Sequence, residues 1–110
     1  MAQGRKTGPV RGSKTGRPIM VALDLLGKRW SLRVLWELRA GPHTFRSLQT
    51  ACEDVSPGVL NTRLKELREA GLIDRSEAGY VLTPIGAQLG EAIGPLDTWS
   101  QKWIKQLGGG

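Results

Sequence analysis

The chain has 110 residues, 16 of them basic and 10 acidic, which gives a formal net charge of +6. This length allows one domain at most. Cys52 is the single cysteine, so an intramolecular disulfide framework is excluded and we expect a reducing, cytoplasmic setting. We expect no membrane span and no secretory signal, because Asp24 and Lys28 interrupt the longest apolar stretches.

The first 17 residues differ in composition from the rest. They contain no acidic residue, and Met1 and Val10 are their only large apolar groups, so they cannot bury enough surface to offset the entropy of ordering. We predict a disordered basic arm over 1–17, an ordered domain over 18–107 and a frayed glycine tail over 108–110. The basic residues of the arm are Arg5, Lys6, Arg11, Lys14 and Arg17. Such an arm suggests a polyanionic partner, although many basic tails serve only solubility.

Two apolar helices are predicted at the start of the domain. Residues 18–27 predict a first helix, with Pro18 near its start and Gly27 at its end. Residues 30–41 predict a second helix that is apolar nearly all round, except for the strip around Arg33 and Glu37. A helix of this kind is expected at the centre of the fold.

A connector over 42–45, with at most a one- or two-residue strand, leads to a third helix. Thr44 is a candidate N-cap for residues 45–53. Phe45, Leu48 and Cys52 follow at helical spacing and predict its buried face.

The segment SPGVLNTRLKELREAG, residues 56–71, predicts the fourth helix. Ser56 is a candidate N-cap and Pro57 stands at the first helical position. The buried face is predicted from Leu60, Leu64 and Leu67, and Gly71 ends the pattern. Residues 72–82 then read as a short β-hairpin.

The C-terminal part repeats the same start signal. Thr83 and Pro84 predict a helix beginning at 84, and Pro95 is expected to start or kink a final helix. The predicted fold class is mostly α with a small β-hairpin. A helix-turn-helix followed by a hairpin is a winged helix-turn-helix, here with extra N- and C-terminal helices.

The face of the fourth helix opposite its leucines is the candidate binding surface. It carries Gly58, Thr62 and Lys65, with Asn61 at one edge. In a helix-turn-helix the N-terminal residues of the second helix face base edges, while nearby cations and amides hold phosphates. An ordinary solvated face is the alternative, and Glu66 and Glu69 fit that alternative.

Several stretches carry a family resemblance: LDLLGKRWSLRVLWELRAGPHTFRSLQ, VSPGVLNTRLKELREAGLIDR and YVLTPIGAQL, followed by a tryptophan-containing helix. From residue 18 to about 104 the chain resembles the HxlR-type winged helix-turn-helix transcriptional regulators, which are related to MarR-type repressors. The resemblance implies a cytoplasmic prokaryotic regulator, dimeric, that binds double-stranded DNA at an inverted-repeat operator. It places recognition on Ser56, Pro57, Gly58, Asn61, Thr62 and Arg63, with a positioning arginine at Arg75.

Three features depart from the family pattern. The wing tip SEAG (76–79) has no cation, Gly58 stands where a basic or polar residue is frequent, and Arg17 stands where many members have a cysteine that can sense oxidants or electrophiles. We therefore expect the wing to contribute little to minor-groove reading. The stretch TGRP (15–18) is similar to part of an AT-hook, so the arm can take over that contact.

No catalytic or metal constellation is recognisable. His43 and Cys52 have no third partner at ligand spacing, and a zinc site needs three or four donors. We expect no enzyme activity, no metal and no cofactor, and we expect Cys52 to be an inert core thiol.

The outer helices predict a homodimer, because a winged-helix body of about 65 residues cannot also cover them. The expected interface residues are Ile19, Leu23, Leu26, Leu96, Trp99 and Trp103. An aromatic small-molecule effector bound between the first and last helices is the alternative use of this surface. Beside a sequence-specific regulator, two further functions stay open: an architectural DNA-binding protein that uses the arm and DNA shape, and a winged helix used only for protein–protein assembly.

Overall fold

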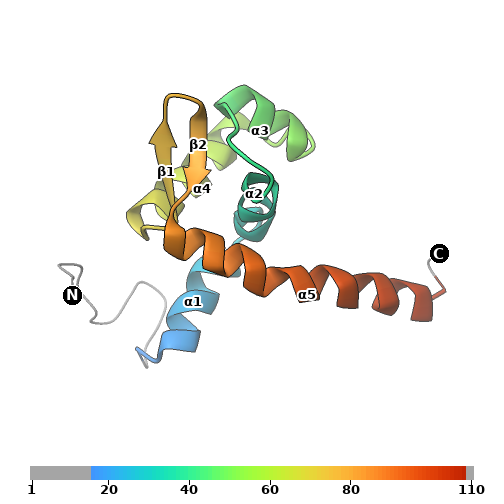
Figure 1. Ribbon diagram of the computed structural model, residues 1–110. Helices are drawn as coiled ribbons and strands as arrows, with labels where there is room; N and C mark the ends of the chain where they lie inside the picture. Colours follow the sequence, from blue (N-terminus) through green and yellow to red (C-terminus); the bar gives the residue numbers. More distant parts are fainter. Residues whose placement is uncertain (1–15, 109–110) are drawn as a thin grey trace.

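A computed structural model of the protein describes residues 16–108, which form five helices and one hairpin (Figure 1). The elements in chain order are α1 (Pro18–Leu26), α2 (Ser31–Leu38), α3 (Phe45–Ala51), α4 (Pro57–Glu69), β1 (Ile73–Ser76), β2 (Gly79–Leu82) and α5 (Pro84–Gln106). The predicted winged helix-turn-helix is confirmed. Most of the predicted arm, residues 1–15, and the last two glycines lie outside the described residues. Within the described range, no helix is long and apolar enough to cross a membrane.

The predicted N-caps are confirmed. The side-chain oxygens of Thr44, Ser56 and Thr83 accept hydrogen bonds from backbone N–H groups three residues on, at 3.0, 3.2 and 3.1 Å. The end of α4 is also as expected, since Gly71 follows it in a left-handed conformation (φ +79°). The second helix is shorter than the predicted range of residues 30–41. Helix α2 starts after Trp30, whose φ of +80° is left-handed, and ends at Leu38.

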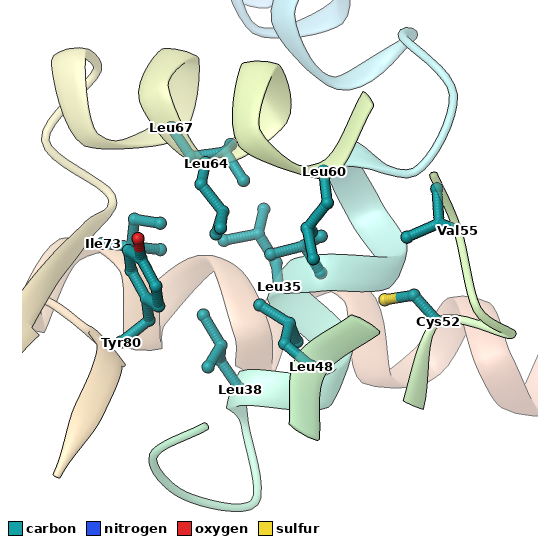
Figure 2. Close-up of a cluster of buried hydrophobic side chains, with 11 residues drawn as sticks. Leu35, Leu38, Leu48, Cys52, Val55, Leu60, Leu64, Leu67, Ile73 and Tyr80 are labelled. Atoms are coloured by element: carbon teal, nitrogen blue, oxygen red, sulfur yellow. The ribbon is translucent and has the colours of Figure 1, made fainter. Parts of the chain in front are cut away.

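The core is built around α2, as the sequence predicts. Val34 and Leu35 have no exposed surface, and the leucine face of α4 packs against them from one side (Figure 2). The other buried side chains of this cluster are Leu38, Leu48, Cys52, Val55, Leu60, Leu64, Leu67, Ile73 and Tyr80. The buried faces predicted for α3 and α4 are therefore confirmed, except that Phe45 is only partly buried.

The wing is an antiparallel hairpin with one additional bridge. Strands β1 and β2 pair in register from Ile73–Leu82 to Ser76–Gly79. His43, in the connector before α3, exchanges both backbone hydrogen bonds with Tyr80 at 3.1 and 2.7 Å. This bridge is the short strand expected in residues 42–45, and it fixes the hairpin against the start of α3.

The prediction that Pro95 could start a separate final helix was wrong, because α5 is one helix of 23 residues with Pro95 inside it. A proline disfavours helical backbone at the preceding residue partly through that residue's Cβ. Here the preceding residue is Gly94, which has no Cβ, so the helix can continue. Pro95 and Glu91 are both exposed, so the carbonyl group that loses its donor can bond to water. The C-terminal half of α5 extends well beyond the body of the domain (Figure 1).

Candidate nucleic-acid interface

The outward face of α4 is arranged as the leucine spacing predicts. Leu60, Leu64 and Leu67 are at most 1% exposed, and Gly58, Asn61, Thr62 and Lys65 are exposed on the rest of the helix. Because the inward face is fixed by the core, the outward polar groups have a defined direction. These groups suit contacts with base edges and phosphates.

Two hydroxyl groups of this face are partly used by the helix itself. The Ser56 oxygen accepts the hydrogen bond from the Val59 N–H group, so the group it can offer to a phosphate is its hydrogen. The Thr62 hydroxyl donates to the carbonyl oxygen of Gly58 at 3.0 Å. Thr62 can therefore offer an acceptor oxygen or its methyl group to a base, whereas Asn61 can both donate and accept.

Gly58 lies in the first turn of α4, next to Pro57. A Cβ added at Gly58 meets no atom of the described chain within 4 Å, and the residue has ordinary helical backbone. Glycine is therefore not required here by internal packing or by φ. Its lack of a side chain leaves room for a molecule that approaches the first turn of α4 from outside.

Arg63 lies differently from its neighbours at the start of α4. Its side chain is 18% exposed, and one guanidinium nitrogen lies 3.3 Å from the Glu66 carboxylate. Glu66 also accepts a hydrogen bond of 3.0 Å from the ammonium group of Lys28, in the loop between α1 and α2. Arg63 therefore stands at the flank of α4, in contact with the protein and not on the open face.

Arg33 of α2 holds the turn that connects α3 to α4. Its guanidinium donates to Glu37 at 2.8 Å, to Glu53 at 3.0 Å and to the carbonyl oxygen of Ala51 at 2.7 Å. The hydrogen bonds to Glu37 and Glu53 raise the pKa of Arg33. The turn needs such support because Glu53 and Asp54 both have left-handed φ values, +58° and +59°. The sequence indicated only the Arg33–Glu37 spacing and missed the contact with the turn.

The wing carries one of the predicted residues. The guanidinium of Arg75, on β1, lies 4.9 Å from the centre of the ring of Tyr80, its partner on β2, one residue pair before the tip of the hairpin. The tip is formed by Glu77 and Ala78, both exposed. Of the basic residues of the predicted arm, Arg17 is described and is exposed at the N-cap of α1, whereas Arg5, Lys6, Arg11 and Lys14 lie outside the described residues.

Cys52 has no exposed surface, and burial raises the pKa of its thiol. Both properties disfavour the reactive thiolate. The His43 ring lies 2.8 Å from the Ser47 hydroxyl, so it interacts within its own segment. Across residues 16–108 no three His, Cys, Asp or Glu side chains gather as metal ligands would.

The outer helices expose a large apolar surface. Ile19, Leu23, Leu96, Trp99 and Trp103 are 48–58% exposed, and the two tryptophan rings stack at 5.4 Å. Leu26, predicted for the same surface, instead packs partly buried against the core. Isolated apolar side chains are common on protein surfaces, but a cluster such as the stacked Trp99–Trp103 pair on α5 is of the kind that marks an interaction site.

A groove of about 460 Å³ lies between α2 and α5, lined by Leu32 and Trp36 on one side and Ile93 and Leu96 on the other. The sequence analysis considered a ligand pocket between the first and last helices. The groove lies instead between α2 and the last helix, α5. Trp36 is stacked by the Arg39 guanidinium, 3.7 Å from the ring centre.

A winged helix with an exposed polar face on the second helix of its helix-turn-helix is the architecture of DNA-binding regulators. The sequence profile of the HxlR-like helix-turn-helix family matches residues 25–107, and the chain belongs to that family. It is 32% identical over 90 residues to the HTH-type transcriptional regulator YvaP of Bacillus subtilis, a match that covers 76% of this chain and 83% of YvaP. A second relative, the regulator MJ0925 of Methanocaldococcus jannaschii, is 31% identical over 83 residues, covering 72% of this chain and 78% of MJ0925.

Among solved structures, quinone-bound YodB from Bacillus subtilis is similar with a TM-score of 0.70 and 30% identity. The similarity covers 76% of this chain and 96% of YodB. These findings make the chain a helix-turn-helix transcriptional regulator, and they confirm the family resemblance read from the sequence.

Proposed function

We propose that this protein is a sequence-specific regulator that binds an inverted-repeat operator as a homodimer and reads it with α4. The observation that carries the proposal is the exposed face of α4, where Thr62 lies opposite a fully buried leucine face and Asn61 lies exposed at its edge. In a two-fold dimer the two α4 helices enter successive major grooves, at half-sites about 10 bp apart.

The apolar surface of α1 and α5 supports the dimer. Five large apolar side chains that are about half exposed would each gain roughly 0.8–1.5 kcal/mol if the remaining surface were covered, half the value for burying a fully exposed side chain. A two-fold arrangement that places these helices of two chains against each other covers them without any further partner.

Regulation by a small molecule through a cysteine is not expected in this protein. Quinone is bound by the similar protein YodB. In this chain the single cysteine is buried, and Arg17 stands at the position of the family's sensor cysteine. If an effector exists, we propose that it binds non-covalently, with the α2–α5 groove as its site.

Selection of bound sequences from a random DNA pool tests the main proposal. We expect an inverted repeat with half-sites about one helical turn apart. The variants Asn61→Ala and Thr62→Ala should lose about 1–3 kcal/mol of preference for that sequence over random DNA. Lys65→Ala is the matched control, since loss of a phosphate contact weakens both DNAs alike.

The two alternatives give different results in the same experiment. Binding without an enriched sequence, and unchanged preference in the Asn61 and Thr62 variants, would favour an architectural protein. A wild type that binds no DNA at all would favour a winged helix used for protein–protein assembly.

A further inference from the structure

Three charged side chains meet at the flank of α4, on the side of the α1–α2 loop. Lys28 and Glu66 are 3.0 Å apart, and Glu66 and Arg63 are 3.3 Å apart. The Glu66 and Arg63 side chains are only 15% and 18% exposed, and Lys28 is 37% exposed. Two cations therefore share one carboxylate in a partly desolvated place.

The two cations are held in different ways. Lys28 makes a hydrogen bond with one carboxylate oxygen of Glu66. Arg63 faces the other oxygen, Oε1, which lies buried without a hydrogen-bond partner in the described structure, as does the Nε atom of Arg63 itself. Glu66 therefore attracts Arg63 by charge, without the well-aligned, bidentate hydrogen bonds that make arginine–carboxylate pairs strong.

This arrangement makes Arg63 the more easily released of the two cations. Its guanidinium has donors left over and stands at the end of a long side chain beside the exposed face of α4. A planar guanidinium fits a phosphate group in a bidentate manner. If Arg63 leaves, Glu66 keeps the charge of Lys28, so no buried carboxylate is left unpaired, which would be strongly unfavourable.

We propose that Arg63 is a DNA phosphate-binding residue that Glu66 holds against the protein in the free state, and that Lys28 is the positioning residue that allows its release. The inference rests on the proposed function and adds to it a control on α4 from the α1–α2 loop. The free protein then keeps one cation of its recognition helix turned inward until a DNA phosphate replaces the carboxylate.

The test uses the full-length protein and one fixed DNA duplex, with affinity measured by fluorescence anisotropy over a range of salt concentrations. Arg63→Gln should flatten the slope of log K against log salt by about 0.9 per chain, with about tenfold weaker binding at low salt. Lys28→Met should act in the same direction, because Glu66 then has no other cation and retains Arg63.

The double variant Lys28→Met/Glu66→Gln separates release of Arg63 from direct contact by Lys28. We expect it to recover the wild-type salt slope and to bind within about twofold of the wild type, since no carboxylate remains to hold Arg63. Lys102→Met, an exposed cation on α5, is the matched control and should leave the slope unchanged. Thermal unfolding of each variant shows whether it is folded, and the comparison of Lys28→Met with the double variant does not depend on Arg63→Gln.

Two results would overturn the inference. The first is an unchanged slope in a folded Arg63→Gln, and the second is a double variant that binds as weakly as Lys28→Met. A wild type that binds no DNA would instead refute the proposed function itself, so the two failures are distinguishable.

Discussion

Replacing Gly58 by alanine should make the protein more stable and bind DNA less well. In a helix, alanine is more favourable than glycine by about 0.5–1 kcal/mol. The new methyl group meets nothing within 4 Å in the described chain, so no steric cost offsets this gain. For a domain of this size the gain corresponds to an increase of about 2–8 °C in Tm.

The effect on binding has the opposite sign if DNA packs against the first turn of α4. A methyl group placed between the helix and the DNA backbone should weaken binding at least tenfold, or about 1.4 kcal/mol. Thermal unfolding and anisotropy with the selected duplex measure the two quantities. Thr98→Ala, at an exposed position of α5, is the control, since it raises helix propensity by a similar amount and should leave DNA affinity unchanged.

A Gly58→Ala variant that is stabilised and binds like the wild type would show that DNA does not approach this turn closely. The placement of the N-terminus of α4 in the groove would then be refuted. A destabilised Gly58→Ala variant would contradict the conclusion that the space around Gly58 can accept a methyl group without steric cost.

Three further predictions concern other parts of the chain. Trp99→Ala should shift the protein toward the monomer in sedimentation velocity at micromolar concentration, since it removes a large part of the proposed dimer surface; a wild type that is itself monomeric would contradict the dimer. Removal of residues 1–17 should flatten the slope of log K against log salt by up to about 4–5 per chain if the arm neutralises phosphates, while the ranking of DNA sequences stays the same; an identical slope would leave the arm a solubility tail. Burial raises the pKa of the Cys52 thiol from its ordinary value of 9.0, so the folded state keeps the thiol proton at a pH where the unfolded state has lost it. The free energy of unfolding should therefore fall as the pH rises above about 9. Urea unfolding of Cys52→Ala should lack this part of the alkaline loss, and an equal loss in both proteins would refute the prediction.

The sequence predicted those features that depend on local chemistry and spacing. The N-caps at Thr44, Ser56 and Thr83, the buried leucines of α4 and the exposed tryptophans of α5 follow from rules that act within one or two helical turns. The open face of α4 could be predicted for the same reason, because it is the remainder of a helix whose inner face is fixed.

Contacts between distant segments were not predictable in this way. Lys28 and Glu66 are 38 residues apart, and only the packing of the α1–α2 loop on α4 brings them together. Arg33 reaches Glu53 over 20 residues for the same reason. These two contacts join α4 and the turn before it to the α1–α2 loop and to α2, so the sequence identified the candidate binding helix but not these groups beside it.

The unbroken course of α5 has a mechanical consequence. Its N-cap is tied to the turn that follows α4, because the Thr83 hydroxyl donates to the carbonyl oxygen of Gly71 at 2.6 Å, and its C-terminal half carries the stacked tryptophans. With 23 residues the helix is about 34 Å long, and in the proposed dimer it would connect the subunit contact to the part of the domain that carries α4. A tilt of about 5° at one end displaces the other by about 3 Å, close to the rise of one base pair (about 3.4 Å). In a two-fold dimer, the bending stiffness of α5 around Gly94 and Pro95 would set how far the spacing of two half-sites can depart from its optimum.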